Sequence, residues 1–92
     1  MKKQGKEVVD SPKHYHPRVS PEEMKAIIER INKRGFIEAI DVIQAWNLNF
    51  PLGSNVKYVL RCGEKDDEVT ELQKAIKYLE FEIEQRKAKR NG

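Results

Sequence analysis

Cysteine is nearly absent from the sequence, and long apolar segments are absent altogether. The single cysteine, Cys62, cannot form an internal disulfide, so a reducing, cytoplasmic setting is expected. The longest uncharged stretch lies between Asp41 and Lys57 and contains Gln, Asn, Pro and Gly, so it falls short of the ~18 apolar residues of a membrane span. No apolar segment follows the N-terminal Met-Lys-Lys-Gln-Gly-Lys, and no signal peptide is therefore expected.

A strong charge imbalance is absent too. The chain has 18 Lys and Arg residues against 15 Asp and Glu residues, a net charge of +3. This balance excludes a histone-like protein and mildly favours anionic partners such as nucleotides. A chain of 92 residues forms one domain with a thin core, and oligomerisation commonly compensates for a thin core. A homo-oligomer is therefore expected.

The patterning predicts an all-α fold, because no segment reads as a convincing strand. Residues 1–19 are expected to form a flexible basic tail, since Ser11-Pro12 and His16-Pro17 interrupt any helix. Residues 20–90 are expected to form a single helical domain, a small bundle of about four helices.

Two helices are predicted in the first half of this domain. Ser20-Pro21-Glu22-Glu23 combines a capping box with proline at the first helical position, and Gly35 ends the helix that follows. The segment 36–47 is apolar on nearly all sides, which predicts a second, buried helix.

Two more helices are predicted in the second half. A loop over 49–53 leads to a short third helix that Ser54 or Asn55 caps and that ends near Arg61. The long last helix begins at 66–68 and reaches about Ala88. Because its apolar stripe is too wide to leave in water, we expect it to pack beside the second helix. The stripe consists of Val69, Leu72, Ile76, Leu79 and Ile83.

Two acidic pairs have the spacing of metal ligands. Glu38 and Asp41 share a face of the second helix, and Glu68 and Glu71 share a face of the last. If these helices pack together, Glu38, Asp41 and Glu71 offer the oxygen ligands that Mg²⁺ prefers. The spacing resembles that of all-α nucleoside triphosphate pyrophosphatases, in which E-x-x-E precedes E-x-x-D, whereas here the order is reversed. Solvated helix faces are the alternative interpretation.

Basic residues form a second set of candidates. Lys57 and Arg61 share a face of the third helix, with Lys65 and Lys74 beyond them. Arginine offers phosphate a planar fork and lysine a point charge. The turn 53–55 precedes a helix N-terminus, which can also hold an anion, although the spacing of a P-loop is absent.

The tail contains a further candidate group, His14-Tyr15-His16. These side chains offer a phosphate contact, a stacking ring or a metal ligand. Two histidines without a cysteine partner make a poor zinc site. The aromatic residues Trp46, Tyr58 and Tyr78 are expected to pack in the core.

Four blocks of the chain carry a resemblance to a known family. They are His14-Tyr15, Ile37-Glu38-Ala39-Ile40-Asp41-Val42-Ile43, Gly53-Ser54-Asn55-Val56-Lys57-Tyr58-Val59-Leu60-Arg61, and Leu72-Gln73-Lys74-Ala75 with Tyr78-Leu79. Over about residues 13–84 the chain resembles a small phage-encoded family catalogued as a domain of unknown function. That family is similar to the nucleotide kinase of certain lytic podophages, which has no P-loop and phosphorylates deoxynucleoside monophosphates.

The resemblance implies a kinase-like phosphoryl-transfer enzyme that acts on nucleotides in the host cell cytoplasm. Glu38 and Asp41 are then the catalytic residues, and Mg²⁺ is held by Glu38, Asp41 and Glu71. The substrate and phosphate ligands are His14, Tyr15, Asn55, Lys57, Tyr58, Arg61, Lys65 and Lys74.

Three alternatives stay open. The same residues fit a non-catalytic protein that sequesters a nucleotide or a cyclic-nucleotide defence signal, and they fit a metal-dependent pyrophosphatase-like hydrolase. EDTA is expected to abolish metal-dependent catalysis but to leave nucleotide binding without catalysis largely intact, so it distinguishes an enzyme from a sequestering protein. The basic segments around Lys2 and at 86–90 fit nucleic-acid binding, but the near-neutral balance of the remaining chain argues against it.

Overall fold

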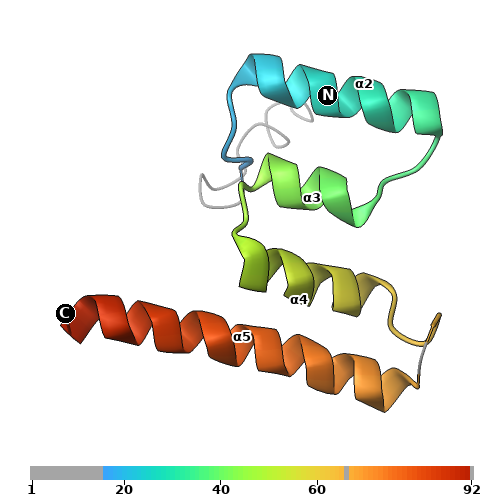
Figure 1. The fold of residues 1–92 in the computed structure, drawn as a ribbon. Helices are drawn as coiled ribbons and strands as arrows, with labels where there is room; N and C mark the ends of the chain where they lie inside the picture. The colour runs from blue at the N-terminus through green and yellow to red at the C-terminus, as the bar shows by residue number, and fades with distance from the viewer. Residues whose placement is uncertain (1–15, 66, 92) are drawn as a thin grey trace, which may run out of the picture.

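The computed structural model describes residues 16–65 and 67–91, so the predictions for residues 1–15, including His14 and Tyr15, lie outside the described residues. Four helices make up most of this part of the chain: α2 (Pro21–Arg34), α3 (Ala39–Ala45), α4 (Phe50–Leu60) and α5 (Glu68–Asn91) (Figure 1). The all-α class, the four helices and the long last helix are confirmed. Within the described residues, none of the helices is long and apolar enough to cross a bilayer.

The helix α2 begins and ends as the sequence predicts. Ser20 Oγ accepts a hydrogen bond from the Glu23 backbone N–H at 3.1 Å, and Glu23 Oε1 accepts one from the Ser20 N–H at 3.0 Å. At the other end, Gly35 adopts the left-handed region with φ 91° and donates its N–H to the Ile31 carbonyl. Both ends of the helix are therefore satisfied by local sequence alone.

The helix α3 is shorter and less buried than predicted. It spans Ala39–Ala45 rather than 36–47, and Phe36 and Ile37 are 56% and 66% exposed in the preceding segment. The Asp41 carboxylate accepts the Glu38 backbone N–H at 2.7 Å, which satisfies a backbone donor at the start of the helix. Asp41 thus marks the first turn of α3 rather than its middle.

The predicted loop over 49–53 is wrong, because this segment forms the beginning of α4. Asn49 Oδ1 caps the helix by accepting the Leu52 N–H at 3.1 Å, and Pro51 lies in the first turn, where its missing N–H is tolerated. Gly53 lies inside the helix, where a Cβ would meet the Ile43 side chain at 3.4 Å. Glycine therefore marks the close approach of α4 to α3 and not a turn.

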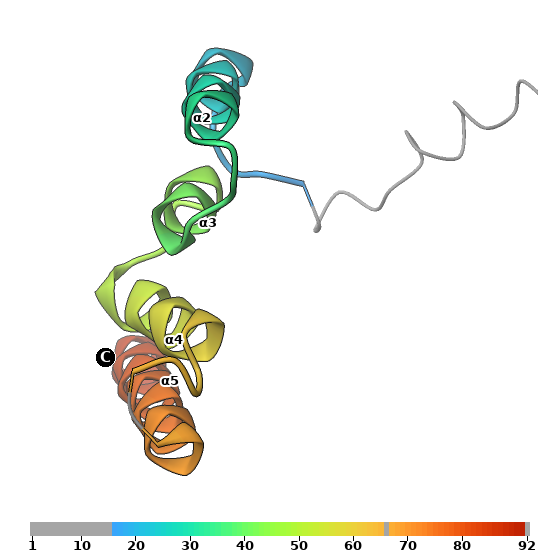
Figure 2. The same ribbon diagram turned by 90° about the vertical axis from the view of Figure 1, so that its right-hand side faces the viewer.

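Each helix packs on its neighbours along the chain: α2 on α3, α3 on α4, and α4 on α5. The view in Figure 2 shows the four helices stacked in a single row. The prediction that the second and fourth helices are neighbours is wrong, since α4 separates α3 from α5. The radius of gyration, 16.6 Å, exceeds the roughly 12 Å of a compact chain of this length.

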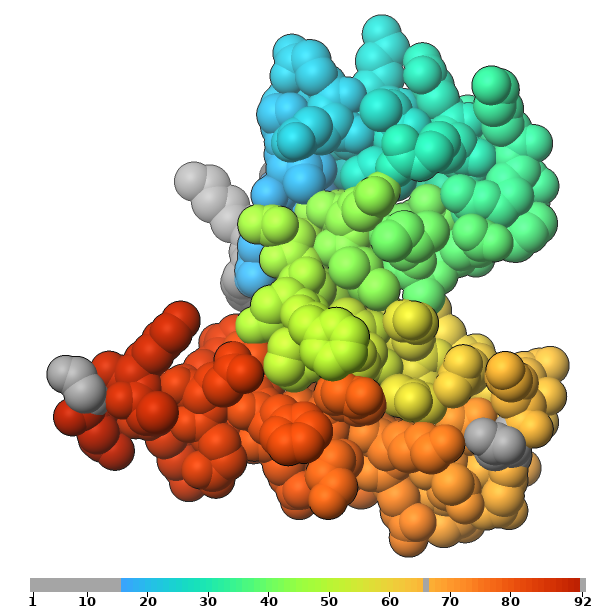
Figure 3. Space-filling model, viewed as in Figure 1, coloured from blue at the N-terminus to red at the C-terminus, as the bar shows by residue number. Residues whose placement is uncertain are grey.

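This open arrangement buries little apolar surface. In the described part of the chain, the buried hydrophobic residues are Ile27, Ala45 and Ala75. The apolar stripe of α5, predicted to pack against α3, is exposed along its whole length, from 41% at Leu79 to 59% at Val69. The C-terminal half of α5 also projects beyond the other helices (Figures 1 and 3).

Candidate functional site

The junction between α4 and α5 is largely polar and positions most of the candidate side chains. Asn55 Nδ2 donates to the Ala75 carbonyl at 2.8 Å, and Asn49 Nδ2 donates to Glu82 Oε1 at 2.8 Å. Pro51 and Ser54 of α4 are buried here. Asn55, predicted as a phosphate ligand, therefore has its amide engaged in holding the two helices together.

Arg61 and Glu71 meet at one end of this junction. The Glu71 side chain is fully buried, and its Oε2 lies 3.6 Å from Nε of Arg61, whose side chain is 35% exposed. A buried carboxylate requires compensating charge, which the guanidinium supplies. The Arg61 guanidinium carbon also lies 4.6 Å from the centroid of the Tyr58 ring. Arg61 is thus held by two partners while part of it faces solvent.

Four aromatic rings continue this surface along the two helices. The Tyr58 and Tyr78 rings are stacked, with centroids 5.7 Å apart and an interplanar angle of 16°. Phe50 and Phe81 contact Tyr78 edge-on at 5.8 and 5.9 Å. Phe50 and Phe81 are exposed, so the rings form a surface and not a closed core. The prediction that Tyr58 and Tyr78 are core residues is only partly right, because both are half-buried.

Lysines surround the stacked tyrosines. Lys74 Nζ lies 5.6 Å from the centroid of Tyr58. Lys57 contributes to a hollow of about 140 Å³ beside Phe50 and Arg61, and Lys77 contributes to one of about 390 Å³ beside Phe81. Tyr58 and Tyr78 line both hollows, which makes them parts of one site. We call it the basic-aromatic surface: Phe50, Lys57, Tyr58, Arg61, Lys74, Lys77, Tyr78 and Phe81.

Besides Phe50 on α4, three members of this surface on α5 were not among the predicted ligands: Lys77, Tyr78 and Phe81. Their signal is visible in the sequence, because they follow Lys74 by three, four and seven residues, the spacing of one helix face. Two of the predicted phosphate ligands in the described part of the chain are not part of the surface. Asn55 lies in the helix junction, and Lys65 lies exposed in the segment between α4 and α5.

The predicted catalytic pair lies at a different junction, between α2 and α3. Arg34 binds the Asp41 carboxylate through both Nη atoms, at 2.7 and 3.2 Å, and its Nε lies 3.5 Å from Glu38. The hydrogen bond from Arg34, aided by the Glu38 backbone N–H, holds the pKa of Asp41 below its ordinary value. The same interaction raises the pKa of Arg34. The cation that pairs with Asp41 is therefore Arg34, and neither Lys57 nor Arg61 takes part.

The Mg²⁺ site stays a prediction. Within residues 16–65 and 67–91, no group of three His, Cys, Asp or Glu side chains is close enough to hold a metal ion. Glu38 and Asp41 lie beside Arg34, whereas Glu71 lies beside Arg61. The three acids thus occupy two separate helix junctions.

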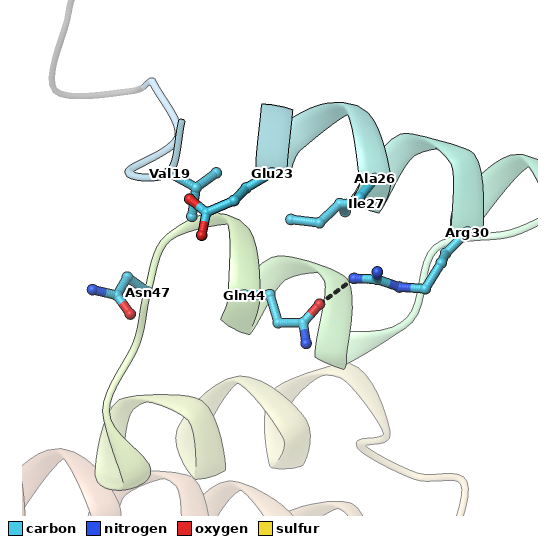
Figure 4. A pocket seen from close by; sticks show the side chains of 7 residues that line it. All are labelled: Val19, Glu23, Ala26, Ile27, Arg30, Gln44 and Asn47. Atoms are coloured by element: carbon cyan, nitrogen blue, oxygen red, sulfur yellow. Dashed lines mark hydrogen bonds between the residues drawn. The ribbon is translucent and has the colours of Figure 1, made fainter. Parts of the chain in front are cut away.

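A further hollow of about 330 Å³ lies between α2 and α3. Figure 4 shows Arg30 and Gln44 hydrogen-bonded across it, with the Ile27 side chain on the α2 side. None of the predicted site residues in the described part of the chain lines this hollow.

The comparison with protein families supports the coarser part of the resemblance, membership of a family of unknown function. The model of a family of unknown function, DUF3310, matches residues 9–80. The chain belongs to the DUF3310 family. The matched range contains all of the predicted site residues and every member of the basic-aromatic surface except Phe81. No curated protein and no solved structure matches the chain, and the likeness to a nucleotide kinase stays a prediction.

Proposed function

We propose that this DUF3310 protein binds a nucleotide on the basic-aromatic surface. The observation that carries the proposal is the pair of stacked tyrosines with Arg61 and Lys74 on the same Tyr58 ring, at 4.6 and 5.6 Å. An exposed aromatic surface suits a base, and adjacent Lys and Arg side chains suit phosphate oxygens. A nucleotide presents both chemistries within one small ligand.

The size and position of the surface favour a nucleotide over a nucleic acid. Its cations lie within α4, the residue that follows it, and the first half of α5: Lys57, Arg61, Lys74 and Lys77. A long polyanion is bound through a more extended series of phosphate contacts, and its affinity falls steeply with salt. The compact group matches a few phosphates and one base.

A more specific version of this proposal is that the protein catalyses kinase-like phosphoryl transfer on the bound nucleotide. Such catalysis consists mostly of positioning and charge neutralisation, which Arg61, held by Glu71, is suited to provide. When Mg²⁺ takes part in such chemistry, it commonly binds through substrate phosphates, waters and one or two carboxylates; Glu71, the carboxylate in contact with Arg61, is fully buried, so substrate phosphates would supply most of the ligands. Turnover that requires Mg²⁺ and stops with EDTA supports this finer proposal, while metal-independent binding without turnover supports capture.

Lys57→Ala is the variant that tests the phosphate contact. Lys57 is exposed on α4, so its loss leaves the helix junction intact, whereas Arg61→Ala also removes a charged partner of buried Glu71. We expect nucleotide binding, measured by calorimetry with the deoxynucleoside mono- and triphosphates, to weaken by about 1–2 kcal/mol, roughly 5- to 30-fold in Kd. Lys25→Ala is the matched control, since Lys25 is an exposed lysine on α2.

Phe81→Ala tests the base contact in the same titrations. Loss of a stacking ring weakens binding by about 1–3 kcal/mol per base, so we expect weaker binding of nucleotides and unchanged binding of inorganic pyrophosphate. The proposal is wrong if the protein binds no nucleotide, or if Lys57→Ala and Lys25→Ala bind equally well.

A further inference from the structure

The helix α5 has three distinct faces, and one of them is uncovered. At about 100° per residue, the faces lie roughly a third of a turn apart. Glu71, Ala75 and Glu82 face α4 and are buried. A second face carries the four α5 members of the basic-aromatic surface, Lys74, Lys77, Tyr78 and Phe81. The third face is the apolar stripe, which the structure leaves to solvent.

The apolar stripe has the spacing of a helix-pairing seam. Val69, Leu72, Ile76, Leu79 and Ile83 follow one another by three and four residues in turn, which is the a and d pattern of a coiled coil. All five are between 41% and 59% exposed. A row of this length is more apolar surface than a monomer ordinarily leaves in water, so it indicates an interaction surface.

We propose that a second copy of this chain covers the apolar stripe, with the two α5 helices antiparallel. The distribution of charge along α5 selects both the partner and its direction. The exposed charge of the first turn is acidic, from Glu68, because Glu71 is buried against α4, and the last turn is basic, with Lys89 and Arg90. A parallel pair places like charges side by side, whereas an antiparallel pair places each basic end beside the partner's acidic end.

The spacing of the stripe allows two antiparallel registers seven residues apart, and the charges of α5 select between them. Placing Leu72 opposite the partner's Ile83 brings Ile76 opposite the partner's Leu79, and the two-fold axis repeats both layers. In this register Glu68 is level with the partner's Lys87, whereas the other register, with Leu72 opposite the partner's Ile76, makes Glu68 level with the partner's Glu80. The dimer is closed by its symmetry, because the same stripe serves both copies. The basic-aromatic surfaces lie on another face of α5 and stay open, so this proposal does not rest on the proposed function.

Molar mass in solution tests the dimer. We expect light scattering at tens of micromolar to give twice the chain mass of 10.8 kDa. Ile83→Glu places a charge in the stripe and is expected to give a monomer that keeps its helical circular dichroism. Phe81→Glu is the matched control, because Phe81 is on the same helix and is equally exposed, at 51%, but lies on the basic-aromatic face. A wild-type mass near 10.8 kDa, or an equal effect of both substitutions, overturns the proposal.

Cysteine cross-linking tests the direction of the helices. In a Cys62→Ser background, Leu72→Cys chains are mixed with Ile83→Cys chains and oxidised. The antiparallel pair predicts a cross-link between the two kinds of chain and little cross-linking of either kind with itself. Residues 72 and 83 are about 16 Å apart along the helix, so a parallel pair gives the reverse result. Cross-linking of Leu72→Cys with itself would overturn the antiparallel arrangement.

Discussion

At the scale of single residues, buried carboxylates hold the helix junctions of this protein. Asp41 is 2% exposed and binds Arg34 of α2, while Glu71 is fully buried beside Arg61 of α4. Glu82 accepts hydrogen bonds from Asn49 at 2.8 Å and from Arg86 at 2.6 Å. Because little apolar surface is buried, these polar contacts contribute to holding the helices together.

Acidification should therefore weaken the fold. Hydrogen bonds from Arg34 lower the pKa of Asp41 below its ordinary 3.8, and those from Arg86 and Asn49 lower the pKa of Glu82 below its ordinary 4.5. The unfolded chain binds these protons more readily, so the stabilisation is fully present above about pH 5 and is lost as the pH falls through the lowered pKa values. We expect the urea concentration at the unfolding midpoint to decrease as the pH is lowered from about 5 to about 3, a range that brackets the ordinary pKa values of the two groups.

Asp41→Asn is the variant that assigns this acid sensitivity. It removes the charge but keeps the shape of the side chain, so we expect a lower urea midpoint at neutral pH and a smaller further loss in acid. If acid lowers the urea midpoint of the variant as much as that of the wild type, Asp41 makes no contribution to the acid sensitivity.

At the scale of elements, Asn49 connects the start of α4 to α5. Its Oδ1 caps α4, and its Nδ2 donates to Glu82 on α5. Ser20, at the exposed start of α2, serves as a cap only. One residue therefore contributes both to the start of α4 and to its packing on α5.

Replacing Ser20 and Asn49 with alanine separates the contribution of helix capping to stability from that of the contact between Asn49 and α5. We expect Ser20→Ala to cost about 1 kcal/mol, the usual value for a cap. Asn49→Ala should cost more than Ser20→Ala, because it also removes a hydrogen bond that Glu82 accepts. Urea unfolding followed by circular dichroism measures both values, and equal losses would contradict a structural role for the contact with Glu82.

At the scale of the whole molecule, the protein is a single row of helices with little buried apolar surface (Figure 2). A domain of this kind gains stability when a partner covers its apolar faces. The proposed dimer therefore links folding to association, and the stability should depend on protein concentration.

Thermal unfolding tests this link. We expect the Tm of the wild type to rise by about 3–5 °C for a tenfold increase in protein concentration, as mass action requires for a folded dimer that unfolds to monomers. The Ile83→Glu variant should show a Tm that does not change with concentration. A wild-type Tm independent of concentration would contradict the coupling.

The sequence by itself determined the local features of this protein. Ser20, Glu23 and Gly35 fixed both ends of α2, because capping depends on residues within one turn. The helical class and the long last helix followed from apolar periodicity, which is also a local property. Lys57 and Arg61, the candidate phosphate ligands, are four residues apart, so the sequence also predicts that they share one helix face.

Only the tertiary structure decided which faces meet. The stripe of α5 was expected to face α3, yet α5 turns Glu71, Ala75 and Glu82 towards α4, where Arg61 and Asn49 pair with the two acids. Asp41 similarly pairs with Arg34 rather than with the cations of α4. Pairings of this kind depend on how rigid helices dock, and a periodic pattern shows that a face needs a partner without showing which one it finds.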